Sequence, residues 1–195
     1  MPYHKYVFDV NKRKFVGKFE EMYQNEDKNG YDSWYQEDLT NLSRQISLAI
    51  LNRYNFSRVL DVGCGKGTFT HLLKKANNEV VGIDVSETAI EKARAKYRNI
   101  DFKVLSVDEL MKMQQERYDL VIMLEVLSYL ENWRQVIKYI ANITRYVYVS
   151  LYIPADPVGF VKNFENLRSE ITKYFNIEVE NLLNNEVILV LGVRK

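Results

Sequence analysis

Glycines at alternate positions form the part of this sequence best suited to holding a ligand. Gly63, Gly65 and Gly67 lie in the run VLDVGCGKGTF, between an apolar stretch and a predicted helix. Glycine allows a sharp backbone turn and lets a ligand approach where a Cβ atom would collide with it. Asp84 follows the next apolar stretch along the chain. An acidic side chain at such a strand end can accept hydrogen bonds from both hydroxyls of a ribose.

The spacing of these glycines indicates which class of ligand the loop suits. A dinucleotide-binding loop has the pattern G-x-G-x-x-G, and its helix N-terminus receives a pyrophosphate. Here the pattern is G-x-G-x-G, and Asp61 precedes it. The Asp61 carboxylate would repel a pyrophosphate, but it can accept a hydrogen bond from an ammonium group, directly or through water. The implied ligand has a ribose, a cationic end and no phosphate, which describes S-adenosylmethionine; a tight structural turn is the alternative.

The elements around this loop predict an α/β fold. Strand and helix patterns alternate five times from residue 58 onward, which favours a doubly wound, mostly parallel sheet with helices on both faces. Seven strands are predicted, at residues 59–62, 79–83, 102–105, 118–124, 146–151, 174–179 and 187–193. Too few residues separate the last two strands for a crossover helix, so we expect an antiparallel C-terminal hairpin at one edge.

Helical spacing of apolar residues predicts the remaining elements. Helices are expected at residues 15–23, 39–54, 69–76, 89–97, 110–115, 133–144 and 161–173, with a loop at 25–33. Ser86 stands where the helix over 89–97 needs an N-cap. Residues 1–56 are predicted to form an N-terminal helical segment that serves as a lid or binds the substrate. Residues 57–195 are predicted to form the cofactor-binding domain.

The composition argues against several classes of protein. The chain has 195 residues, and its 27 Lys and Arg nearly balance 26 Asp and Glu, for a net charge of +1. Gripping a nucleic-acid backbone needs a basic surplus, so we expect no nucleic-acid partner. Cys64 is the single cysteine, which excludes an intramolecular disulfide and a multi-cysteine zinc site. No apolar run reaches the roughly 18 residues of a membrane helix, so we expect a cytoplasmic protein without membrane contact.

Three motifs carry a resemblance to a known family. With VLDVGCGKGTF, VVGIDVS and YDLVIMLEVLSYLEN, the chain from about residue 57 onward resembles the class I S-adenosylmethionine-dependent methyltransferases. The resemblance implies that Gly63 and Gly65, in the loop that Gly67 completes, line the methionine part of the cofactor. It also implies that Asp61 organises the cofactor's amino group and that the backbone carbonyl of Leu124 accepts from the same ammonium.

The resemblance assigns the nucleoside end of the cofactor to other residues. Asp84 would hold the ribose and Val85 would lie against the adenine. Many members of the family have an aspartate at the end of the third strand that receives the adenine amino group. Ser106 stands at that position here and Val107 follows it, so Asp108 is the expected substitute.

Residues after the fourth and fifth strands are candidates for the chemistry, because ligands bind beyond the carboxyl ends of such strands. Glu125 is the preferred general base or acceptor-binding carboxylate, and bracing its own loop is an equally weighted alternative. Tyr129 either steers the acceptor or packs as one of 14 tyrosines. Ser128 and Tyr152 are further candidates, whereas His71 is expected on the surface.

The N-terminal segment supplies two more candidates. Trp34 precedes a predicted amphipathic helix, and Arg44 lies on it. As parts of a lid, Trp34 could lie near a sulfonium and Arg44 near the methionine carboxylate. The alternatives are a core anchor for Trp34 and a solvated charge for Arg44.

These patterns predict an S-adenosylmethionine-dependent methyltransferase for a small polar acceptor. The N-terminal segment and MLEVLSYLEN resemble the NodS-like branch, which implies N- or O-methylation of a sugar or amino sugar. One alternative is a non-catalytic partner that binds the cofactor, and another is a nucleic-acid or protein methyltransferase. The expected partner is a small-molecule acceptor, no metal ligand set is indicated, and the oligomeric state is left open.

Overall fold

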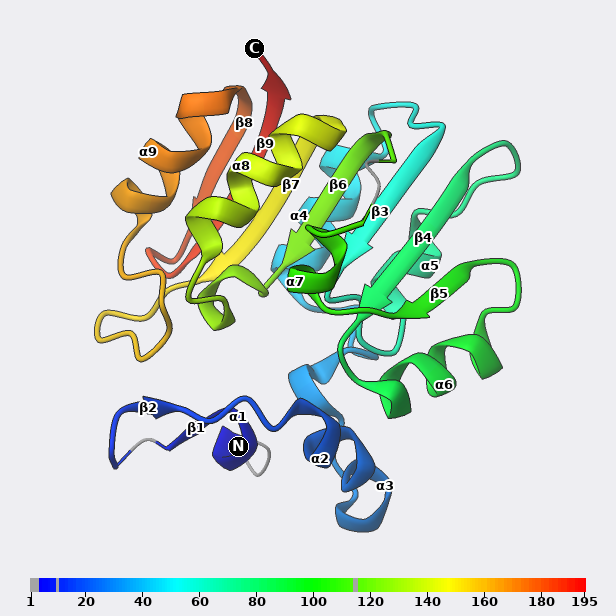
Figure 1. Ribbon diagram of the computed structural model, residues 1–195, viewed down its shortest axis with the longest axis vertical. Coiled ribbons are helices and arrows are strands. Elements are labelled where there is room, and N and C mark those ends of the chain that lie inside the picture. The colour runs from blue at the N-terminus through cyan, green and yellow to red at the C-terminus, as the bar shows by residue number, and fades with distance from the viewer. Residues whose placement is uncertain (1–3, 10, 114–115) are drawn as a thin grey trace.

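A seven-stranded sheet forms the centre of the computed structural model, which describes residues 4–9, 11–113 and 116–195. Its strand order is β5-β4-β3-β6-β7-β9-β8 (Figure 1). The strands are β3 (Arg58–Val62), β4 (Glu79–Asp84), β5 (Asp101–Val104), β6 (Tyr118–Leu124), β7 (Thr144–Tyr152), β8 (Phe175–Leu183) and β9 (Val187–Arg194). The first five are parallel, and β9 runs antiparallel to both β7 and β8. The predicted fold class is therefore confirmed, including the C-terminal hairpin.

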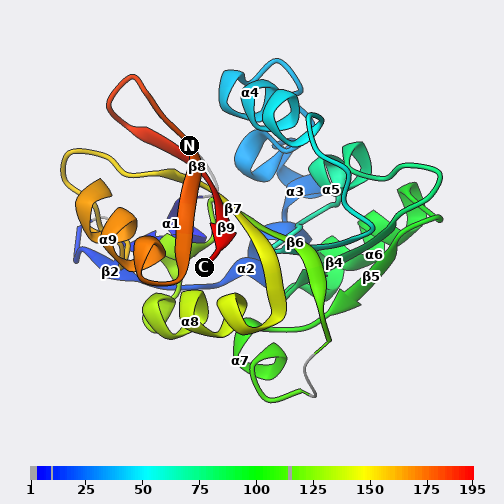
Figure 2. The ribbon, with the colours of Figure 1, turned by 90° about the horizontal axis from the view of Figure 1, so that it is seen from above.

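Helices cover both faces of the sheet (Figure 2). One face carries α7 (Val107–Leu110), α8 (Trp133–Ile143) and α9 (Phe164–Tyr174). The other face carries α4 (Leu42–Leu51), α5 (Thr68–Leu72) and α6 (Glu87–Lys96). Across the described ranges, no helix is long and apolar enough to cross a membrane.

Strand β6 lies at the centre of the sheet, and this position explains why its sequence is almost entirely apolar. Val121 and Met123 pack with α8 on one face, whereas Leu120 and Ile122 pack with α4, α5 and α6 on the other. All four side chains are buried, since successive residues of a strand point to opposite faces and both faces are covered here.

The N-terminal elements lie across the carboxyl ends of the parallel strands, at the bottom of Figure 1. They are α1 (His4–Val7), β1 (Phe8–Asp9), β2 (Lys14–Phe15), α2 (Phe19–Gln24) and α3 (Glu26–Asn29). Two expectations for this segment were wrong. The helix expected over 15–23 begins only at Phe19, because Phe15 pairs with Phe8 in a small hairpin. The stretch 25–33 was predicted as a loop, yet it contains α3.

Other helices also differ from their predicted bounds, and α7 and α5 show the clearest physical reasons. The helix expected at 110–115 is replaced by α7, which ends at Leu110; residues 114–115 lie outside the described residues. Ser106 and Glu109 form a reciprocal capping box, and this fixes the start of α7. Helix α5 ends before residue 76 because the Asn78 side chain donates to the Leu73 carbonyl (2.9 Å) and accepts from the Lys75 amide (2.8 Å).

The left-handed turn at Gly67 yields a stability prediction. Gly67 has φ 76°, and a Cβ atom there would lie 2.5 Å from the Phe102 ring. Gly30 has φ 62° with open space around it, so Gly30→Ala is a matched control. We expect Gly30→Ala to reduce the free energy of unfolding by about 1–2 kcal/mol and Gly67→Ala by about 2–5 kcal/mol, because only the second adds overpacking. Urea denaturation measures both, and equal losses would contradict the contact with Phe102.

Candidate functional site

The site lies where the strand order changes direction. From β3 the chain continues to β4 and β5 on one side, and then returns to pair β6 with the other side of β3. Such a switch point opens a crevice at the carboxyl ends of the strands. A cavity of about 840 Å³ lies there. Its volume falls within the range of about 300–1,000 Å³ that is typical of small-molecule sites.

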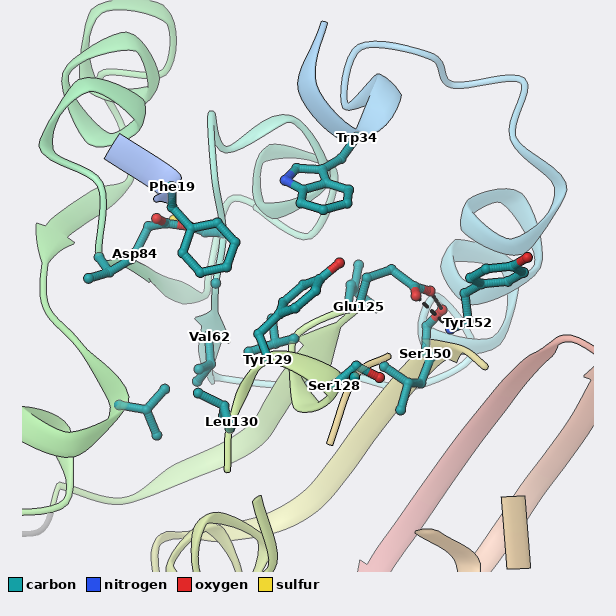
Figure 3. Close-up of a pocket in the computed structure, with 18 of the residues that line it drawn as sticks. Phe19, Trp34, Val62, Asp84, Glu125, Ser128, Tyr129, Leu130, Ser150 and Tyr152 are labelled. Atoms are coloured by element: carbon teal, nitrogen blue, oxygen red, sulfur yellow. Dashed lines mark hydrogen bonds between the residues drawn. The ribbon is translucent and has the colours of Figure 1, made fainter. Parts of the chain in front are cut away.

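Figure 3 displays the two ends of this cavity. Asp84 lies at one end, Glu125 and Ser150 lie at the other, and Tyr129 projects between them beside Trp34. The cavity is therefore elongated and carries a carboxyl group near each end.

The three loop glycines make different contacts. Gly63 borders the cavity, and its left-handed backbone (φ 74°) passes so close to Val126 that a Cβ atom would lie 2.4 Å from that side chain. Gly65 packs against the Gln36 amide and Gly67 against Phe102. The structure thus brings Gly63 to the candidate ligand space, whereas Gly65 and Gly67 allow neighbouring side chains to approach the loop.

Asp84 is buried at the end of β4, and its carboxylate accepts two backbone hydrogen bonds. Gly65 N–H donates to one oxygen and Ser86 N–H to the other, both at 2.9 Å. Burial raises the pKa of Asp84, and these hydrogen bonds offset part of that effect. Since a carboxylate has about four acceptor positions, Asp84 can accept further hydrogen bonds from a ligand in the cavity.

Asp61 lies under the glycine loop and is 2% exposed. Thr70 Oγ1 donates to its carboxylate at 2.6 Å. Burial raises the pKa of Asp61 to about 7 even though the Thr70 hydrogen bond lowers it, and the negative charge of Asp84 adds to the increase. A cationic ligand beside Asp61 would favour its ionised form, so this end of the cavity suits a positive group.

The loops after β4 and β5 form the wall next to Asp84. Val85, Ser106, Val107 and Asp108, the residues predicted for the adenine end, all border the cavity. The Ser106 hydroxyl donates to the Glu109 carboxylate (2.6 Å) as part of the helix cap. Asp108 accepts a hydrogen bond from the Asn132 amide at 2.8 Å. The two polar candidates for an adenine contact therefore already have partners within the fold.

Glu125 has an unusual backbone at the opposite end. It directly follows Leu124, the last residue of β6, and it has φ 61°, which is rare for a residue with a side chain. Its carboxylate accepts from Ser150 Oγ (2.8 Å) and from the Tyr152 amide (2.6 Å), while its own amide donates to the Ser150 carbonyl. Burial raises the pKa of Glu125, and the two accepted hydrogen bonds counteract this. Both predicted roles, bracing the loop and facing a ligand, are compatible with this position.

Tyr129 stands at the centre of an aromatic cluster. Its ring contacts those of Phe8, Phe15, Phe19 and Trp34, with centroids 5.4–6.2 Å apart. All five rings border the cavity. The cluster joins the N-terminal segment to the loop after β6, so Tyr129 has a packing role in addition to facing the ligand space.

Arg44 also borders the cavity and ties together the residues before α4. Its guanidinium donates to the backbone carbonyls of Trp34 (2.8 Å) and Asp38 (3.1 Å), and to that of Tyr35. Arg44 therefore holds residues 34–38 in place in addition to bordering the cavity.

The remaining candidates differ in whether they lie at the cavity and in whether their environment favours reactivity. Ser128 and Tyr152 border the cavity, on the side of Glu125. His71 is exposed and stacks on Tyr97, with ring centroids 4.4 Å apart, as a surface residue would. Cys64 is buried beside the cavity, and burial raises the pKa of its thiol, which disfavours the reactive thiolate. Within the described part of the chain, His, Cys, Asp and Glu form no group of three or more that could hold a metal ion.

Several cavity residues were missed in the sequence. Phe8, Phe15, Phe19, Tyr23 and Gln36 all come from the N-terminal segment. They follow no motif, and their approach to the cavity depends on how the segment folds back over the strand ends. An aromatic-rich stretch before the first strand was the available signal.

Comparison with known proteins agrees with this architecture. Residues 55–191 match the family described as methyltransferase domain. The match covers more than half of the chain, and the chain therefore belongs to the methyltransferase domain family.

Individual relatives are more distant. The ubiquinone biosynthesis O-methyltransferase of Acinetobacter baylyi is 31% identical over 86 residues, which cover 42% of this chain and 36% of that protein. The chain thus matches about a third of that relative's length. The N-methyltransferase NodS from Bradyrhizobium japonicum, solved with S-adenosyl-L-homocysteine, superposes with a TM-score of 0.71 at 20% identity, covering 88% of this chain and 97% of NodS. The magnesium protoporphyrin IX methyltransferase from Synechocystis gives a TM-score of 0.66 at 19% identity, covering 78% and 82%.

The buried carboxyl of Asp61 predicts a pH-dependent effect on stability. An unfolded aspartate ionises near pH 3.9, but folded Asp61 ionises only near pH 7, so stability falls as pH rises through that window. Asp61→Asn removes this loss while keeping an acceptor for Thr70. At each pH, the quantity of interest is the unfolding free energy of the variant minus that of wild type. We expect this difference to be up to about 4 kcal/mol larger at pH 8 than at pH 4.

Urea unfolding at the two pH values measures this gain. Asp101→Asn, at the start of β5, makes the same change of charge on the surface and serves as the control. A gain for Asp61→Asn that is the same at both pH values would show that the carboxyl is not held neutral.

Proposed function

We propose that this chain is an S-adenosylmethionine-dependent methyltransferase that acts on a small polar acceptor. The observation that carries the proposal is one continuous cavity at the switch point, bordered by Asp61, Gly63 and Asp84 at one end and by Glu125 at the other. Membership of the methyltransferase domain family supports it. The relatives solved with S-adenosyl-L-homocysteine share the fold and make this cofactor the natural one to test.

The residues around the cavity fit such a cofactor. The Asp84 carboxylate retains acceptor positions for ribose hydroxyls, and Gly63 leaves room for a close backbone approach. Asp61 and the Leu124 carbonyl would receive the ammonium group. Val85 is 54% exposed and offers an apolar surface to an adenine.

Positioning would supply most of the rate. When bound, the cofactor provides an activated methyl group, and the acceptor atom must lie in line with the carbon–sulfur bond that breaks as the new bond forms. Glu125, Ser128 and Tyr152 would orient the acceptor, and Glu125 would take the proton that an amine or hydroxyl releases. The aromatic cluster at Tyr129 would exclude water from the space between the two ligands.

The acceptor proposed is a sugar or amino sugar, methylated on nitrogen or oxygen. Polar side chains at the Glu125 end of the cavity, including Ser128 and Ser150, suit a ligand with several hydroxyl groups. The superposition with NodS over most of both chains supports the choice of amino sugars as the first acceptors to test.

Calorimetry tests the cofactor. We expect S-adenosylmethionine and S-adenosylhomocysteine to bind and NAD not to bind. Asp84→Ala should weaken binding of both by about 1–3 kcal/mol, because ribose hydroxyls lose their acceptor. Asp101→Ala is the control, since Asp101 does not border the cavity. Binding of NAD alone, or unchanged affinity in Asp84→Ala, would contradict the assignment.

Turnover with a panel of amino sugars and sugar nucleotides tests the reaction. Glu125→Gln should lower kcat about 10²-fold or more if Glu125 accepts the proton, while the cofactor Kd changes little. Gln can still accept from the Tyr152 amide, so the loop should keep its shape. Glu131→Gln, an exposed change six residues along the chain, is the control. Full activity in Glu125→Gln would contradict its proposed role, and cofactor binding without turnover of any acceptor would favour the non-catalytic alternative.

A further inference from the structure

Two of the backbone hydrogen bonds that hold the Asp84 carboxylate come from loops that the N-terminal segment contacts. Ser86 N–H donates to Oδ1 and Gly65 N–H donates to Oδ2. Each of these donors lies in a turn, where the direction of an N–H depends on what holds the turn in place. In both turns, that contact includes a polar side chain from residues 20–36.

Glu20, on α2, holds the turn at Ser86. Its carboxylate accepts from Ser86 Oγ (2.6 Å), from Thr88 Oγ1 (2.5 Å) and from the Thr88 amide (3.2 Å). The Ser86 hydroxyl in turn accepts from the Ala89 amide as the N-cap of α6. Glu20 therefore satisfies donors at the start of α6 and restrains the residue whose amide reaches Asp84.

Gln36 holds the turn at Gly65. Its side-chain oxygen accepts from the Lys66 amide (2.7 Å), and its side-chain nitrogen donates to the Tyr23 hydroxyl (2.6 Å). The amide group lies so close to Gly65 that a Cβ atom there would be 2.4 Å from it. The absence of a side chain at Gly65 is thus what allows Gln36 to cover the loop.

A buried group of charges anchors the same segment to the glycine loop. The Lys66 ammonium lies 2.6 Å from Asp32 and 3.3 Å from Glu26, and Lys92 lies 3.0 Å from Glu26. Glu26 and Lys66 are both buried, and Glu26 also accepts from the Ser33 amide (2.8 Å). Breaking such a buried pair is strongly unfavourable, so these contacts keep Gln36 in position.

We propose that Glu20 and Gln36 are positioning residues for ribose recognition, acting through Ser86 and Gly65 on the Asp84 carboxylate. Glu20 does not border the cavity, so it acts only through Ser86, whereas Gln36 borders the cavity in addition to contacting the glycine loop. This inference rests on the proposed function, because it takes Asp84 to be the residue that binds the ribose.

Calorimetry with S-adenosylhomocysteine and its 2′-deoxy analogue tests this role. Wild-type protein should bind the deoxy analogue at least about fivefold more weakly, since Asp84 loses one hydrogen bond. In Glu20→Ala that ratio should fall towards one, because the carboxylate is no longer held for the hydroxyl. Glu21→Ala, on the exposed side of the same helix, is the matched control and should keep the wild-type ratio.

The ratio separates positioning from a purely structural role. A variant that only loosens the N-terminal segment would weaken both ligands equally and leave the ratio unchanged, which would overturn the inference. In an Asp84→Ala background, adding Glu20→Ala should not change the ratio further, and a further decrease would also overturn it.

Gln36→Ala is a second variant that tests the same role. It replaces Glu20→Ala if thermal melts show that Glu20→Ala is unfolded. It should lower the ratio through Gly65, and a wild-type ratio in this folded variant would count against the inference. Failure of the proposed function gives a different result, because the wild-type protein would then bind neither ligand.

Discussion

The burial of two carboxyl groups beneath one glycine loop is the constraint on which the rest of this structure depends. Removing Asp61 and Asp84 from water is unfavourable unless donors are provided, and the fold provides Thr70 for the first and the amides of Gly65 and Ser86 for the second. The left-handed glycines make the loop tight enough to bring the Gly65 amide close to Asp84. A site built in this way suits a ligand with a cationic group and hydroxyls, because a positive charge and hydrogen-bond donors stabilise the ionised forms of both carboxyl groups.

Much of the fold could be predicted from the sequence because local patterns and long-range packing agree there. The apolar run of β6 was placed with its observed bounds, since a strand covered on both faces leaves an unmistakable stretch of apolar residues. The hairpin of β8 and β9 followed from the short separation between the strands. Helix α7 was misplaced because the predicted helix began only at residue 110, whereas the capping box of Ser106 and Glu109 starts the helix at Val107.

The site could be predicted only in part. The residues that were predicted lie in local motifs, and those that were missed depend on contacts between residues far apart in the sequence. Asp61, Gly63 and Asp84 lie in motifs whose spacing reflects local turns, and the structure brings all three to the cavity. Gln36 and the ring of Phe15 reach the same cavity through contacts with residues 29 and 114 positions away, at Gly65 and Tyr129. Such contacts arise from tertiary packing and leave no periodic signal in one sequence.

The aromatic cluster around Tyr129 has a consequence for how relatives of this chain are compared. The family match begins at residue 55, yet four of the five rings in the cluster come from before that point. Alignments restricted to the shared core therefore compare the part of the cavity formed at the strand ends and leave out most of the aromatic rings that border it. Two members with equally similar cores can differ in which molecules they admit, and the sequence of the first 54 residues is where such a difference would be found.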